Sequence, residues 1–171
     1  MRIALFGPNG PTGRRLTDQA LAAGHQVVAV TRRSGSVSAR PGRTVAVADA
    51  TDPAAGATDP AAVDAAIDGT DAVLSAPGAR FSKEPITTYS ASATAITRAM
   101  ARHGIKRLLA VGSGTAESSA DGVFTARAEL AAGMLHETAE RRYVRTAMGL
   151  ITTAVQPNLA KLLWNEGVKK K

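Results

Sequence analysis

The stretch MRIALFGPNGPTG, residues 1–13, decides the fold of this chain. Its first half contains the apolar run Ile3 to Phe6, which is typical of a parallel strand covered by helices on both faces. Its second half spaces three glycines as G-x-x-G-x-x-G, and a helical pattern follows. Glycines in this position permit a tight turn and a close approach of phosphate oxygens, and the helix start points its amides at them. The stretch therefore predicts a site for the pyrophosphate of a dinucleotide, with an ordinary strand-to-helix turn as the alternative.

The end of the second apolar run indicates which dinucleotide binds. Val27 to Val30 leads into Thr31, Arg32 and Arg33, with no carboxylate among them. A site for NAD places Asp or Glu here to bond the ribose 2′-hydroxyl, whereas guanidinium groups match the geometry of a phosphate. We therefore predict NADP(H) as the cofactor, with Arg32 the better candidate for its 2′-phosphate. The alternative is that the two arginines are solvated loop residues.

Apolar runs and helical patterns alternate along the rest of the chain. Strands are predicted at residues 2–6, 26–31, 44–48, 72–76, 107–112 and 150–155, and helices at 11–23, 60–67, 86–103 and around 124–148. This order predicts an α/β fold: a Rossmann-type doubly wound parallel sheet with helices on both faces. Ligands of such sheets bind at the carboxyl ends of the strands, so the residues after each strand are the functional candidates.

Length and composition narrow the classes of function. The chain has 171 residues, 44% of them hydrophobic, and it has no cysteine. We therefore expect one domain without disulfide or thiolate chemistry, and a cytoplasmic location without a membrane partner. The net charge is +7, but the last 14 residues hold four of the lysines, and only 4% of residues are aromatic. No specific nucleic-acid site is expected from this pattern.

The chain resembles the atypical short-chain dehydrogenase/reductases. Within them it is similar to the NAD(P)-binding branch of NmrA-like proteins and biliverdin reductase B, also called flavin reductase. The resemblance covers residues 1–157, and the matching stretches are 2–7, 30–32, Asp49, 71–74, 77–80, 99–105, Ser113 and 153–157. It implies an NAD(P)-binding Rossmann domain over residues 1–157. Residues 158–171 would then be a short basic tail, with leucines at helical spacing.

The resemblance implies cofactor contacts at most of the strand ends. They are Gly7, Asn9, Gly10, Pro11, Thr12 and Gly13 at the pyrophosphate, Thr31, Arg32 and Arg33 at the 2′-phosphate, Asp49 and Ala50 beside the adenine, and Ala76, Pro77, Gly78 and Arg80 towards the ribose and nicotinamide. Ser113 would face the nicotinamide and the substrate, and it is the one candidate catalytic residue. The alternatives are a loop cap for Asp49 and a small turn residue for Ser113. No metal ligands are expected.

The chain departs from its relatives in three places. Neither Tyr89 nor Tyr143 is followed four residues later by lysine, so the Tyr-x-x-x-Lys dyad of typical members is absent. His136 lies two positions out of register with a histidine of biliverdin reductase B, and we expect it to be an exposed helix residue. Relatives continue well beyond Gln156-Pro157, whereas this chain has only 14 more residues. We therefore expect a shortened substrate region that is open or completed by another subunit.

Without the dyad or a cysteine, the chemistry has to come from the cofactor. The sequence therefore favours an NADPH-dependent reductase that passes hydride to a flavin or a similar planar, quinone-like acceptor. The first alternative is a non-catalytic NADP-sensing protein of NmrA-like type. The second is a nucleotide-sugar epimerase-like enzyme, which the missing dyad disfavours. Monomer and homo-oligomer both stay open.

Overall fold

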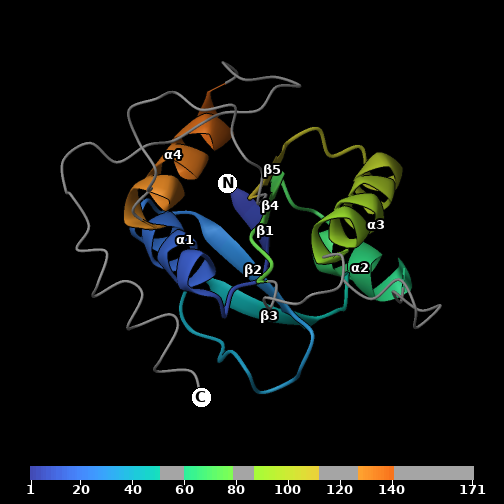
Figure 1. Cartoon of the computed structure of the whole chain (residues 1–171). Coiled ribbons are helices and arrows are strands. Elements are labelled where there is room, and N and C mark those ends of the chain that lie inside the picture. The colour runs from blue at the N-terminus through green and yellow to red at the C-terminus, as the bar shows by residue number, and fades with distance from the viewer. Residues whose placement is uncertain (51–59, 79–86, 112–126, 141–171) are drawn as a thin grey trace, which may run out of the picture.

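A computed structural model describes residues 1–50, 60–78, 87–111 and 127–140 of the chain. These residues form a parallel sheet of five strands in the order β3-β2-β1-β4-β5, with helices packed on both faces (Figure 1). The strands are β1 (Arg2–Phe6), β2 (Gln26–Thr31), β3 (Arg43–Val47), β4 (Ala72–Ser75) and β5 (Leu108–Ala110). The helices are α1 (Pro11–Ala22), α2 (Pro60–Ile67), α3 (Thr88–His103) and α4 (Arg127–Ala139). The predicted α/β, Rossmann-type fold is confirmed.

The strand β1 lies at the centre of the sheet because its residues are apolar towards both faces. Ile3 pairs with Val27 of β2 on one side and with Ala72 of β4 on the other. Residues 3–6 of β1 are all buried, as expected for a strand covered on both faces. The loop that leaves β1 therefore starts between the ends of two neighbouring strands, which is where this fold class binds its ligands.

Each face of the sheet has its own hydrophobic core. On one face, Phe6 and Val30 pack with Ile67 of α2 and with Ile96 and Met100 of α3. On the other face, Leu5 and Val27 of the sheet pack with residues of α1 and α4, namely Leu16, Ala20, Ala131 and Met134. Figure 1 shows the two helix pairs on opposite sides of the strands. None of the helices in the described part of the chain is long and apolar enough to cross a membrane.

The structure corrects several predicted element boundaries. The strand β3 covers residues 43–47 rather than 44–48, because Val27 of β2 already pairs with Arg43. The strand β4 ends at Ser75 and β5 spans only Leu108–Ala110, since each ladder to its neighbour is short. The helix α3 begins at Thr88 rather than 86, and the confirmed part of the long fourth helix is Arg127–Ala139. The predicted strand 150–155 and the tail 158–171 lie outside the described residues.

Candidate cofactor-binding site

The glycine loop after β1 packs directly against the end of β4. Gly7 has φ +79°, and a Cβ added to it would lie 2.3 Å from the carbonyl oxygen of Ala76. Gly13 is equally constrained, because its Cβ would lie 2.1 Å from the carbonyl oxygen of Gly7. A side chain at either position would therefore force the loop away from the sheet or α1 away from the loop. The structure therefore requires glycine at both positions, whereas their contact with phosphate oxygens stays a prediction.

The middle of the same loop is open and leads into a helix start without a side-chain cap. A Cβ on Gly10 would meet no atom closer than 3.6 Å, and Gly10 is the N-cap residue of α1. In the described structure no side chain caps α1, Pro11 begins it, and its first turn has no acidic residue. The amides of a first helical turn lack partners within the helix and favour an anion. Thr12 and Gly13 supply such amides here, so the loop fits a pyrophosphate.

Hydrogen bonds join the glycine loop to the segment that follows β2. The Asn9 side-chain amide donates to Thr31 Oγ1 at 3.4 Å, and Thr31 Oγ1 lies 2.7 Å from Ser36 Oγ. Ser36 Oγ in turn donates to the backbone carbonyl of Arg33 at 2.7 Å. The structure therefore brings together Asn9 and Thr31, two residues predicted from separate parts of the sequence. This network fixes the turn that carries Arg32 and Arg33.

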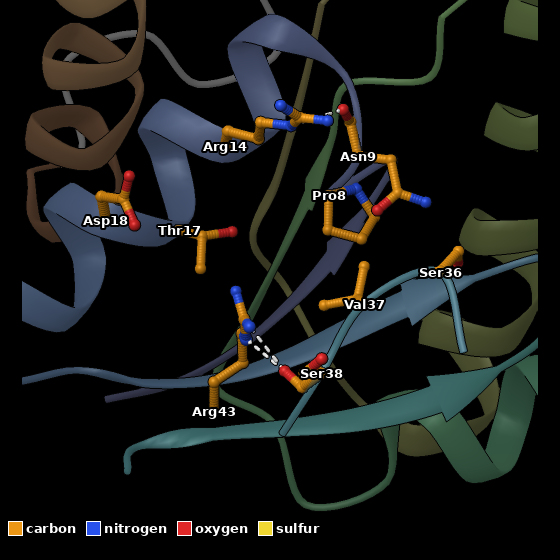
Figure 2. A pocket seen from close by; sticks show the side chains of 9 residues that line it. All are labelled: Pro8, Asn9, Arg14, Thr17, Asp18, Ser36, Val37, Ser38 and Arg43. Atoms are coloured by element: carbon orange, nitrogen blue, oxygen red, sulfur yellow. Dashed lines mark hydrogen bonds between the residues drawn. The ribbon is translucent and has the colours of Figure 1, made fainter. Parts of the chain in front are cut away.

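A cavity of about 320 Å³ lies between α1 and the loop that connects β2 to β3; we call it the α1 cavity (Figure 2). It is lined by Pro8, Asn9, Arg14, Thr17, Asp18, Ser36, Val37, Ser38 and Arg43. Arg32 and Arg33, which the sequence favoured for the 2′-phosphate, are exposed at the end of β2 and do not line it. Arg14 and Arg43 were not predicted from the sequence, although Arg14 directly follows the third glycine.

Both arginines of the α1 cavity are held by backbone carbonyls. Arg14 Nε donates to the Asn9 carbonyl at 3.0 Å, and the Arg43 guanidinium donates through Nε to the Ser38 carbonyl at 3.0 Å. Asp18, the one carboxylate among the described residues that line the cavity, forms an ion pair with Arg40. Burial and the neighbouring charge of Arg40 lower the pKa of Arg43, and Asp18 opposes this effect. The guanidinium groups of the cavity thus outnumber its carboxylate.

The remaining predicted cofactor contacts lie at the ends of β3 and β4. Asp49 is half-buried and Ala50 is buried in the segment after β3, which is joined to β2 by a bond from the Ala48 amide to the Thr31 carbonyl (3.0 Å). Ala76 is buried and donates to the Phe6 carbonyl at 3.0 Å, with Pro77 and Gly78 following it outward. These residues therefore share one edge of the sheet with the glycine loop. Arg80, Ser113 and Tyr143 lie outside the described residues.

A second cavity, of about 330 Å³, lies beneath α3 at the ends of β4 and β5; we call it the α3 cavity. It is lined by Ser75, Pro77, Tyr89, Ser90, Ser92, Ala93, Ile96, Leu108, Ala110 and Val111. Among the described residues, no charged side chain contributes to this lining, and Tyr89 is its aromatic member. This cavity was not predictable from the sequence, because it forms only where α3 crosses the two strands.

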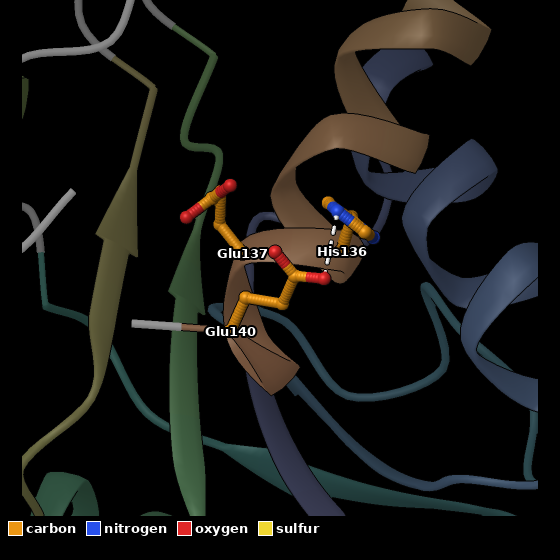
Figure 3. Close-up of side chains that lie close together, drawn as sticks. All are labelled: His136, Glu137 and Glu140. Carbon is orange, nitrogen blue, oxygen red and sulfur yellow. Dashed lines mark ion pairs between the residues drawn. The ribbon is translucent and has the colours of Figure 1, made fainter. Parts of the chain in front are cut away.

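His136 is exposed on α4, as predicted for it (Figure 3). Its Nε2 lies 3.2 Å from Glu140 Oε1, one helical turn further on. Ligand-type atoms of His136, Glu137 and Glu140 lie within 4.8 Å of one another. Ion pairs at this spacing are ordinary features of a helix surface, and they account for the arrangement.

Comparison with known proteins agrees with this geometry. Residues 7–163 match the NAD(P)H-binding family. A protein from Burkholderia pseudomallei is 30% identical, with a TM-score of 0.52 over 81% of this chain and 63% of that chain. The oxidoreductase ylbE from Lactococcus lactis is 16% identical, with a TM-score of 0.56 over 80% and 56%. A Rossmann-fold NAD(P)-binding family protein from Shigella flexneri is 13% identical, with a TM-score of 0.61 over 82% and 87%.

Two of these matches cover only part of the other protein. The chain spans less than two thirds of the Burkholderia and Lactococcus proteins, whereas it spans most of the Shigella protein. The likeness to the Lactococcus and Shigella structures shows the fold alone. The assignment to NAD(P)H binding comes from the family match. The family match and the strand order together show that the chain belongs to the NAD(P)H-binding family of Rossmann-fold proteins.

Proposed function

We propose that the protein is an NADPH-dependent oxidoreductase that reduces a flavin or a similar planar acceptor. The observation that carries the cofactor part is the packing of Gly7 and Gly13. It sets an uncapped helix start beside the ends of β1 and β4, in a chain that belongs to an NAD(P)H-binding family. NADP rather than NAD is supported by the arginines after β2 and by the absence of a carboxylate at that strand end.

The acceptor part of the proposal is supported by the α3 cavity. Pro77 lines this cavity and directly follows Ala76, which touches the glycine loop, so the cavity lies towards the expected nicotinamide side. Its uncharged lining suits an apolar, planar molecule, and the ring of Tyr89 offers a surface for stacking. A volume near 330 Å³ accommodates the ring system of an acceptor better than a whole dinucleotide.

When bound, the reduced cofactor supplies the hydride, and the protein has to bind, orient and shield the two reactants. The glycine loop would hold the pyrophosphate, and Ala76 and Pro77 would limit where the nicotinamide end is able to lie. We propose that Ser113 orients the nicotinamide or the acceptor and that solvent supplies the proton. A cytoplasmic location and a small-molecule partner are parts of the same prediction.

The test is NADPH oxidation followed by absorbance with FMN, riboflavin or a quinone added in turn. We expect oxidation to accelerate with at least one acceptor relative to the reaction without acceptor. Tight NADPH binding with no turnover across the panel would contradict the reductase. That result would support the alternative, a non-catalytic NADP-sensing protein, which the absence of the Tyr-x-x-x-Lys dyad favours.

A further inference from the structure

We infer that the α1 cavity receives the 2′-phosphate of NADP and that Arg14 is the residue through which the chain selects NADP over NAD. This inference rests on the proposed cofactor and deepens it. It replaces Arg32, the stronger candidate from the sequence, with a residue at the start of α1.

The position of the cavity supports this assignment. Its wall includes Pro8 and Asn9 of the glycine loop and Ser36 of the loop after β2. In a Rossmann-type site the pyrophosphate lies over the glycine loop, and the adenosine ribose lies beside the end of the second strand. A phosphate on that ribose would therefore lie between these two segments. Arg14, which rises from α1 towards Asn9, borders the same space (Figure 2).

The charges in the cavity favour an anion. Within the described residues, Arg14 bonds to the Asn9 carbonyl and Arg43 to the Ser38 carbonyl. Neither guanidinium forms an ion pair with a carboxylate there, although the nearby charge of Asp18 acts on Arg43. Asp18 also faces the cavity and would repel a phosphate, but its carboxylate is paired with Arg40. A guanidinium has five N–H donors, and Arg14 uses only Nε in the bond to Asn9. Its terminal amino groups can therefore bind two phosphate oxygens.

The hydrogen bonds around Arg14 hold it in place before a ligand arrives. Its Nε bond fixes the guanidinium to Asn9, and the Asn9 side chain is itself bonded to Thr31. Thr31 contacts Ser36 on the opposite wall of the cavity. Arg14 therefore loses less side-chain entropy on binding than a freely solvated arginine would. Arg14 and Arg32 are both exposed, but Arg32 does not line the cavity and lacks this advantage.

The experiment compares two adenosine fragments that differ in the 2′-phosphate alone: 2′,5′-ADP and 5′-AMP. Each is titrated calorimetrically into the wild-type chain and into Arg14→Ala, Arg14→Lys, Arg32→Ala and Arg15→Ala. Arg15 is the matched control, because it is the next residue of α1, is exposed and does not line the cavity. Thermal unfolding of each variant confirms that the fold is retained.

We expect Arg14→Ala to weaken 2′,5′-ADP binding by roughly tenfold to a hundredfold, the range for a lost charge-assisted hydrogen-bond pair, and to leave 5′-AMP binding unchanged. Arg14→Lys should recover part of the loss, Arg32→Ala should cost less, and Arg15→Ala should change neither fragment's affinity. An unchanged ratio of the two affinities in Arg14→Ala would overturn the inference. If the wild-type chain binds neither NADPH nor NADH, the proposed function itself fails, which is a different result.

Discussion

The α1 cavity and the α3 cavity are of similar size but differ in chemistry. The α1 cavity has two arginines, an acid and several hydroxyl groups in its wall, and Arg14 is bonded to the glycine loop while Arg43 is bonded to Ser38. The described residues that line the α3 cavity include no charged one and are largely small and apolar. Charged groups fixed in place select one ligand strongly, whereas an apolar wall admits a range of molecules of suitable shape. We therefore expect the α1 cavity to discriminate strongly between NADP and NAD, and the α3 cavity to accept a range of acceptors.

The largest loss of stability and of NADPH binding should come from adding a side chain to the glycine loop, which lies between the two cavities. Gly7→Ala places a Cβ against the Ala76 carbonyl and strains a residue with φ +79°. We expect a loss of about 2–5 kcal/mol in the free energy of unfolding, from backbone strain and overpacking together, and the loss of detectable NADPH binding. Urea unfolding and calorimetric titration measure the two effects.

Gly24→Ala is the control for the glycine-loop variant. Gly24 has a similar φ of +76°, but an added Cβ would meet no atom within 4 Å. It should cost only about 1–2 kcal/mol of stability and leave NADPH affinity unchanged. Equal losses of NADPH affinity in the two variants would contradict the proposed role of the loop.

Filling the α3 cavity should separate acceptor reduction from cofactor binding. Ala93 lines this cavity from α3, so Ala93→Leu is expected to lower kcat/KM for the acceptor by about tenfold through steric exclusion. NADPH affinity should not change, because Ala93 does not line the α1 cavity. Steady-state kinetics and NADPH titration give both values. Ala101→Leu, at an exposed position of the same helix, is the control, and an equal loss of turnover there would refute the assignment.

Ionic strength should change NADPH affinity at the α1 cavity but not the KM for the acceptor at the α3 cavity. Raising salt from about 0.05 to about 0.5 M should weaken NADPH binding by roughly threefold more than NADH binding, because the additional phosphate is held by partly solvated arginines. The KM for a neutral acceptor such as riboflavin should stay constant. Titrations at several salt concentrations give the slope of log Kd against log salt concentration for NADPH and for NADH. Identical slopes for NADPH and NADH would show that the 2′-phosphate contacts no cationic group.

The smallest effect is expected for Arg32→Ala. Arg32 and Arg14 are both exposed, but Arg32 does not line the α1 cavity, so its charge should contribute little to binding the 2′-phosphate. NADPH affinity should fall by about two- to fivefold, with NADH affinity unchanged. A loss of NADPH affinity larger than that of Arg14→Ala in the same titration would show that Arg32, at the end of β2, binds the 2′-phosphate, as predicted from the sequence.

The local features of the site could be predicted from the sequence, whereas the cavities could not. The β1–α1 unit with its glycine loop follows from spacing within a single stretch, and the structure confirms the strand and the helix and shows Gly7 and Gly13 closely packed between them. Arg14 and Arg43 are far apart in the sequence, and they line one cavity only because the loop between β2 and β3 packs beside α1. The α3 cavity likewise depends on how one helix crosses two strands. Such long-range packing leaves no short motif in the sequence.

The boundaries of the edge strands were also harder to predict than those of the central strand. Residues 3–6 of β1 are buried on both faces and form an unbroken apolar run. In β3 the pattern is weaker, since Val47 is 51% exposed and the strand has a partner in the described sheet on one side only. The hydrophobic pattern is therefore least informative where the sheet meets solvent.

The most direct test of whether the protein selects NADP over NAD through the 2′-phosphate is a calorimetric comparison of NADPH and NADH binding to the wild-type chain. The two molecules differ in the 2′-phosphate alone, so the ratio of their Kd values measures how much the protein gains from that group. We predict that NADPH binds at least about tenfold more tightly, as expected for a phosphate held by a guanidinium fork. Equal Kd values, or tighter binding of NADH, would contradict the assignment of the α1 cavity and of NADP as the cofactor.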